Sequence, residues 1–155
     1  PPPSFGKVNT ISLMASSGLL IPTQLAPYPI RALEYVINRA FAIDDAREDP
    51  LLILGIAVSM YDNKASKVKK EMFELMNSIL VNDERRKEID ILPEKTWIPN
   101  LSAVSTNTLR GYPLCEAQSD DDLKRYDKES IARAFSHYQE LAISLVEKVS
   151  SVEVK

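Results

Sequence analysis

Short apolar runs alternate with amphipathic stretches along the chain. Apolar runs cover residues 18–25 and 51–58, and a shorter one surrounds Thr96 to Ile98. Runs of this length, bounded by proline or polar residues, are typical of buried strands. The run at 51–58 is the strongest, because Gly55 alone interrupts it. A strand that is apolar on both faces belongs inside a parallel sheet covered by helices.

Four stretches with helical spacing flank these strands. We expect helices over 4–16, 27–49 and 63–80, and from about Asp127 to Val149. The third has one apolar stripe, made of Val68, Met72, Leu75, Met76 and Ile79. Such a stripe marks the face that a helix buries. Residues 81–90 are expected to form a charged connection, and 101–126 an irregular loop.

This order of elements predicts an α/β domain with a three-layer open parallel sheet and helices on both faces. The length of 155 residues suits one domain. Three strands are few beside the roughly 5–6 of an average sheet. Right-handed crossovers would also leave one edge of the sheet bare and apolar. We therefore expect the sheet to be incomplete.

Composition narrows the class of protein. Apolar residues make up 45% and charged residues 26%, as in soluble globular proteins. No apolar run reaches the roughly 18 residues that a membrane-spanning helix needs. The net charge of −3 excludes nucleic-acid binding by bulk charge, so any DNA contact needs a local basic patch. A single cysteine, Cys115, cannot form an internal disulfide, which fits a reducing cytoplasm.

Candidate ligand-binding residues follow the strands. The predicted strand ends carry the sequences IPTQ (21–24), SMYDNK (59–64) and IPNL (98–101). Ligands of open α/β sheets bind at the carboxyl ends of the strands. Asp62 and Asn100 are the polar side chains best placed to contact a ligand there. Both residue types are also ordinary turn and cap residues after a strand, so that alternative stays open.

The sequence contains no complete catalytic motif. We find no CxxC, HExxH, GxSxG or GxxxxGK[ST] pattern. The lone His137 lies on the last predicted helix between Phe135 and Tyr138, and we assign it no role. Cys115 has no histidine partner with a recognisable signature. We therefore expect neither a catalytic residue nor a metal ligand in this chain.

Basic residues gather around the third predicted helix. Lysines crowd its start, and a second basic group follows its end; together they are Lys64, Lys67, Lys69, Lys70, Arg85, Arg86 and Lys87. Lysines at a helix N-terminus oppose the helix dipole, so helix stability does not explain them. They form either a solvated helix face or a surface for phosphate backbones, whose binding would be sensitive to salt.

Five short motifs, taken in order, resemble the ParA-type ATPases, which are deviant P-loop partition proteins related to MinD. The motifs are Pro2-Pro3-Ser4, Ile21-Pro22-Thr23-Gln24, Arg31-Ala32-Leu33, Met60-Tyr61-Asp62 and Ile98-Pro99-Asn100. The resemblance extends to about Val149. It implies that residues 1–155 are the C-terminal part of a ParA-like ATPase domain, the C-terminal half of a P-loop NTPase (deviant Walker) fold.

The resemblance also implies what lies outside this sequence. The phosphate loop, the N-terminal strands and the Asp of the Asp-x-Pro-Pro motif would precede Pro1. Pro2, Pro3 and Ser4 would form the switch segment, and the proline run would be a rigid exit from a strand beside the nucleotide's phosphates. ATP and Mg²⁺ would be cofactors of the full-length protein. This chain alone is expected to bind no cofactor and to be inactive.

Site residues and partners follow from the same resemblance. The adenine would bind between two loops, contributed by Met60, Tyr61, Asp62, Pro99, Asn100 and Leu101. Non-specific nucleoid DNA would bind the basic residues named above together with Arg110. The ATP-bound protein would be a homodimer, and a ParB-like partner would stimulate hydrolysis. The implied function is partition of plasmid or chromosomal DNA, or positioning of a similar cargo, by a cytoplasmic, nucleoid-associated protein.

Two departures from the family pattern matter. The family's Ile-Pro-Arg-Asn-Val-Arg is here Ile98-Pro99-Asn100-Leu101-Ser102-Ala103, which lacks both arginines. The C-terminal sequence SSVEVK is also no basic amphipathic helix of the kind that binds MinD relatives to membranes, so no membrane partner is expected. The alternative from another class is a non-enzymatic binding or oligomerisation module, which completes its sheet with another chain or a second copy.

Overall fold

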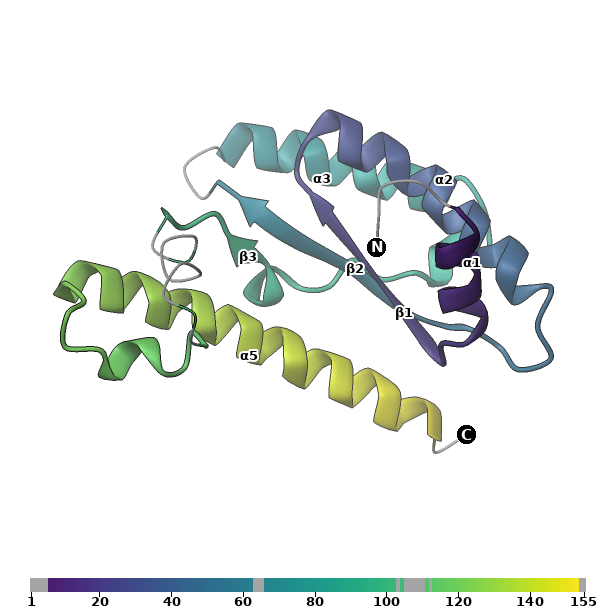
Figure 1. Ribbon diagram of the computed structural model, residues 1–155. Helices are drawn as coiled ribbons and strands as arrows, with labels where there is room; N and C mark the ends of the chain where they lie inside the picture. The colour runs from purple at the N-terminus through teal and green to yellow at the C-terminus, as the bar shows by residue number, and fades with distance from the viewer. Residues whose placement is uncertain (1–5, 63–65, 103, 105–110, 112, 154–155) are drawn as a thin grey trace. The chain divides into compact units, whose positions relative to one another are not determined.

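The computed structural model describes residues 6–62, 66–102, 104, 111 and 113–153. Helices and strands alternate along this part of the chain (Figure 1). In order, the main elements are α1 (Lys7–Met14), β1 (Gly18–Gln24), α2 (Pro27–Asp44), β2 (Leu52–Tyr61), α3 (Ser66–Val81), β3 (Ile98–Pro99) and α5 (Arg125–Glu153). Short 3-10 helices lie at η1 (Arg86–Glu88), η2 (Glu94–Thr96) and η3 (Ala117–Ser119). The α/β class is confirmed.

The strands of the described residues form one sheet in the order β1-β2-β3. β1 and β2 run in the same direction (Figure 1). β3 pairs with β2 in parallel, with Ser59 opposite Ile98 and Tyr61 opposite Pro99. The predicted three-stranded parallel sheet is therefore present, whereas helices on both of its faces stay a prediction.

Several predicted boundaries were wrong. β3 begins at Ile98 and not near Thr96, because Thr96 closes the turn of η2 through its hydroxyl, which donates to the Pro93 carbonyl at 2.8 Å. α2 ends at Asp44 and not at residue 49, because the Asp44 carboxylate turns back to accept the Leu51 N–H at 2.6 Å. α5 continues past Val149 to Glu153.

The described residues fall into two compact units. The first contains residues 6–57 and 66–91, and the second contains 58–62 and the described residues from 92 onward. β2 contributes to both units, since its residues up to Ala57 belong to the first and those from Val58 to the second.

α2 is the centre of the first unit. It packs against β1 on one side and against α1 and α3 on others (Figure 1). Ile30 and Ile37 of α2 and Met76 of α3 are completely buried. The predicted stripe of α3 is partly confirmed, because Met76 lies in the core whereas Val68 at the start of the helix is exposed.

Arg47 fixes the end of α1 within this unit. Its Nη1 donates to the carbonyls of Leu13 at 2.5 Å and of Ser16 at 2.6 Å. The last carbonyls of a helix lack partners in the helix itself, and a guanidinium is a suitable donor for them. The connection between α2 and β2 therefore caps α1.

α5 is the main helix of the second unit. It packs against η2, η3 and β3. Ile131 and Ala134 of α5 are completely buried, and Ile131 forms a small core with Ala117. Leu114 and Leu123 pack around that pair. No helix in the described part of the chain is long and apolar enough to cross a membrane.

β2 departs twice from regular strand geometry. Gly55 has φ +130°, a value that residues with a side chain rarely adopt, which explains the single glycine in the apolar run. Met60 has φ +53°, and the ladder to β3 changes register between Ser59 and Tyr61. The second irregularity lies at the carboxyl end of the strand, where the sequence predicts ligand binding.

Candidate functional site

The structure brings together the two segments that the sequence predicts to bind a ligand. The end of β2 and the end of β3 are adjacent, and both belong to the second unit. The Asn100 N–H donates to the Tyr61 carbonyl at 3.0 Å. The loops after the two strands therefore start side by side, as parallel strands require.

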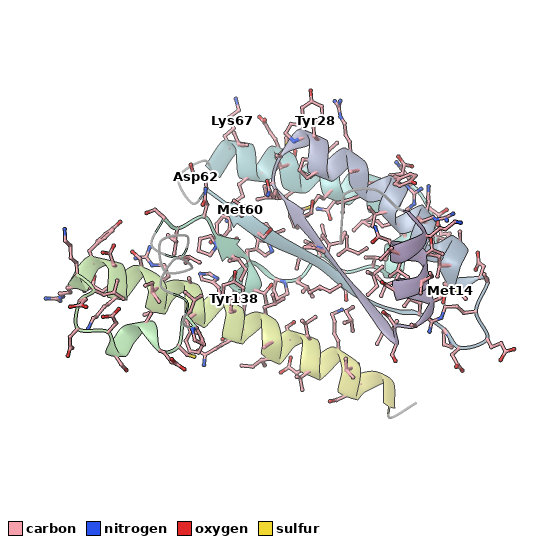
Figure 2. The ribbon with its side chains drawn as sticks, viewed as in Figure 1. Met14, Tyr28, Met60, Asp62, Lys67 and Tyr138 are labelled. Carbon is pink, nitrogen blue, oxygen red and sulfur yellow. The ribbon has the colours of Figure 1, made fainter. Side chains whose placement is uncertain are left out.

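Three of the six predicted nucleotide-binding residues have exposed side chains. These are Met60, Asp62 and Asn100, which we call the rim. Met60 and Asp62 extend from the same end of β2 (Figure 2). Tyr61 and Pro99 are buried, and Leu101 is half-buried, so these three support the rim.

Met60 is the most unusual rim residue. The residue is 58% exposed although it lies in a strand between half-buried Ser59 and buried Tyr61. A left-handed backbone costs a residue with a side chain about 1–2 kcal/mol. The extra residue of a β-bulge redirects a side chain, and bulges are frequent beside binding sites. The bulge therefore directs a thioether outward at the end of β2.

Trp97 supports the rim, although no sequence motif assigns it a role. The residue is 3% exposed, and its indole meets the Tyr61 ring edge-on, with the centroids 5.8 Å apart and the ring planes at 78°. Its Nε1–H donates to the Leu92 carbonyl at 2.8 Å. Trp97 is the single tryptophan and directly precedes the Ile-Pro pair, which was the available signal.

Helix α5 holds the segment that carries Trp97. The Lys95 ammonium lies 2.7 Å from the Glu140 carboxylate, and Nδ1 of His137 lies 2.9 Å from the Lys95 carbonyl. The hydrogen bond to Glu140, followed by its negative charge, raises the pKa of Lys95. His137, to which the sequence assigned no role, thus contacts the backbone of η2.

The rim combines groups that suit a flat heteroaromatic ring. A thioether packs well against aromatic rings. A carboxylate accepts hydrogen bonds, and an amide both donates and accepts them. The described residues contain no group of three or more His, Cys, Asp or Glu side chains that could hold a metal ion. The rim therefore offers one apolar contact and two hydrogen-bonding side chains at the end of the sheet.

Two of the predicted DNA-binding arginines, Arg85 and Arg86, contact acidic residues of α2 and the acidic residue that follows it. Arg85 lies 2.6 Å from Asp44 and 2.9 Å from Asp45, and its guanidinium lies 4.2 Å from the centroid of the Phe41 ring. Arg86 lies 3.0 Å from the Glu34 carboxylate and is 7% exposed. These contacts give both arginines a structural role, and DNA binding by them stays a prediction.

Lys67 and Lys70 of α3 are exposed, and Lys69 is half-buried. The Lys67 side chain is 89% exposed and extends away from the ribbon (Figure 2). Lys67 and Lys70 each lie 3.9 Å from a glutamate one turn later, a weak arrangement for an exposed pair. Lys87 pairs with Glu84. The other predicted residues, Lys64, Arg110, Pro2, Pro3 and Ser4, lie outside the described residues.

Comparison of the sequence with protein-family models and with curated proteins finds no match.

Proposed function

We propose that this chain is the C-terminal portion of a ParA-like ATPase that partitions plasmid or chromosomal DNA or positions a similar cargo. In this proposal the rim contacts the adenine of ATP, and the lysines of α3 contact DNA. The observation that carries the proposal is the hydrogen bond from Asn100 to Tyr61. It joins the two loops that the resemblance assigns to the adenine.

The rim fits the base end of a nucleotide. Met60 offers an apolar contact to the ring, and Asp62 and Asn100 offer hydrogen-bonding groups to its edge. The phosphates and Mg²⁺ are assigned to a segment with the phosphate loop, since the sequence has no Gly-x-x-x-x-Gly-Lys motif. The sheet would then be the C-terminal half of a P-loop NTPase fold, with helices on both faces. ATP supplies the phosphoryl group that is transferred to water.

The DNA surface would consist mainly of lysines. The exposed lysines Lys67 and Lys70 lie on the same helix as Lys69. Lysine side chains neutralise phosphates without reading base sequence. We propose that ATP closes a homodimer that binds nucleoid DNA, and that a ParB-like partner stimulates hydrolysis and release. No membrane contact belongs to this proposal.

Titration of adenosine into the ¹⁵N-labelled chain tests the adenine contact. Adenosine has the base but no phosphates, so unlike ATP it does not need the phosphate loop. Spectra resolve such weak binding residue by residue. We expect the amide signals of Met60, Asp62 and Asn100 to shift with adenosine and much less with uridine. Equal shifts with both nucleosides, or shifts confined to α3, would contradict the proposal.

An alternative function follows from the sheet edge. Within the described residues β1 lies at one edge of the sheet, and Leu19 and Leu20 on it are half-buried. An edge strand is a template for pairing with another chain. A non-enzymatic module that completes its sheet in this way would be a stable dimer or a complex. Size-exclusion chromatography with light scattering distinguishes this alternative from the ParA-like proposal. In the absence of nucleotide, the alternative requires a mass above the 17.4 kDa of one chain.

A further inference from the structure

We propose that Trp97 is a positioning residue for the rim. By packing against Tyr61 it holds Met60 in its outward, left-handed conformation, and it thereby sets the affinity for a flat aromatic base that it does not itself contact. The part that concerns the base rests on the proposed function. The part that concerns Met60 is independent of any ligand.

Trp97 is itself held from several sides. Its side chain donates to the Leu92 carbonyl, and its backbone N–H donates to the Glu94 carbonyl at 3.0 Å. The turn between those residues is tied to α5 by the Lys95–Glu140 ion pair. A buried aromatic ring with a satisfied N–H has little freedom to move. Trp97 is therefore a fixed surface for its neighbours.

Tyr61 depends on that surface because its pairing with β3 is short. β3 contains 2 residues, and one of them is Pro99, which has no N–H to donate to the ladder. Tyr61 accepts the Asn100 N–H, and its ring is placed by the edge-on contact with Trp97. Edge-to-face packing fixes the ring's direction as well as its depth.

Met60 depends in turn on Tyr61. A left-handed residue outside glycine persists when its surroundings determine it from both sides. Here Ser59 pairs with Ile98 before the bulge, and Tyr61 pairs with Pro99 after it. If Tyr61 loses its fixed position, Met60 can relax into ordinary strand geometry. Its thioether would then leave the place where an aromatic base would contact it.

Three variants separate positioning from general stability. Trp97→Leu removes the ring contact and the indole N–H, whereas Trp97→Phe keeps a ring against Tyr61 and loses the bond to Leu92. Ile131→Ala is the matched control, because Ile131 is completely buried in the same unit but belongs to the core around Ala117. All three are purified as the 155-residue chain and compared by thermal unfolding.

Two measurements are made on each variant. The first is the NOE between the amide proton and Hα of Met60, which is strong in a left-handed residue. The second is the affinity for adenosine. We expect Trp97→Leu to lose the strong NOE and to bind adenosine about tenfold more weakly. Trp97→Phe should keep the NOE in part and lose about threefold. Ile131→Ala should lower the melting temperature and leave both measurements unchanged.

The outcomes distinguish the two proposals. If wild type does not bind adenosine but Trp97→Leu loses the Met60 NOE, the proposed function fails and the positioning role stands. If either folded Trp97 variant keeps both the NOE and the affinity of wild type, the positioning role is wrong. It is equally wrong if Ile131→Ala weakens the NOE of Met60 as much as Trp97→Phe does. Should Trp97→Leu not fold, Trp97→Phe decides alone.

Discussion

Nη2 of Arg86 donates to Oδ1 of Asn38 at 2.8 Å, across 48 positions of the sequence. Nη1 of the same guanidinium reaches Glu34, so one arginine binds two residues a turn apart on α2. Because this side chain is almost entirely buried, its charge needs these partners. The contact joins the segment after α3 to α2. It gives Arg86, which the sequence suggested as a DNA-binding residue, a role in packing.

Replacing Arg86 should therefore destabilise the first unit. We expect Arg86→Ala to lower the free energy of unfolding by about 2 kcal/mol, because a buried hydrogen-bonded charge is lost and Asn38 loses its donor. Lys87→Ala is the control, since Lys87 pairs with an exposed glutamate and should cost less than about 0.5 kcal/mol. Urea denaturation measures both, and equal stabilities would refute the structural role.

Replacing the α3 lysines should weaken DNA binding without unfolding the chain. We expect the double change of Lys69 and Lys70 to alanine to reduce the affinity for DNA. The plot of log affinity against log salt should become less steep, with a slope smaller in magnitude by about 2. The assay uses the ATP-bound full-length protein that the proposed function requires. Arg125→Ala with Lys128→Ala removes the same charge from α5 and is the control. An unchanged affinity and slope in the α3 variant would exclude this surface.

Met60→Gly separates the backbone strain at Met60 from the contact that its thioether would make with a base. Glycine adopts a positive φ without steric cost, so we expect a stability within about 1 kcal/mol of wild type. The thioether is lost, so adenosine binding should weaken by several fold. Met14→Leu is the control, because it removes a thioether elsewhere in the chain. Leucine is chosen there and not glycine because Met14 lies in a helix. Wild-type affinity in Met60→Gly would show that the thioether makes no contact.

The Lys95–Glu140 pair predicts a specific pH dependence. The pKa of Lys95 is raised in the folded chain, so its stabilising contribution is complete below the ordinary lysine pKa of 10.5 and is lost as the pH rises through the folded pKa. The stability difference between wild type and Glu140→Gln should therefore shrink above about pH 10.5. Glu129→Gln is the control, because its partner Arg125 is an arginine, which keeps its charge there. If the stability differences of Glu140→Gln and Glu129→Gln changed with pH in the same way, the pH dependence would not come from Lys95.

The parts of the fold that depend on local pattern could be predicted from the sequence. The apolar run at 51–58, which Gly55 alone interrupts, identified the central strand, and helical spacing identified α2, α3 and α5. Asp62 and Asn100 were expected at one edge of the sheet because parallel strands end there together, and the structure places the ends of β2 and β3 side by side. These features need no knowledge of which side chains meet across the fold.

The remaining features depend on contacts between distant residues. Nothing local distinguishes Arg86, which is buried against α2, from exposed Lys67, so both received the same candidate role in DNA binding from the sequence. The left-handed Met60 carries no glycine or asparagine signal, because the pairings on either side impose its conformation. Trp97 and His137 acquire their roles through Tyr61 and the Lys95 carbonyl.

Ala57 and Val58 are neighbours in β2, yet they belong to different compact units. Two domains joined by a linker can melt one after the other. Here the junction is a peptide bond inside a hydrogen-bonded strand, so the loss of either unit frays the strand on which the other is built. We expect one cooperative thermal transition for the whole chain. The near-UV signal of Trp97 in the second unit and the protection of the Ile37 amide from hydrogen exchange in the first should be lost at the same temperature.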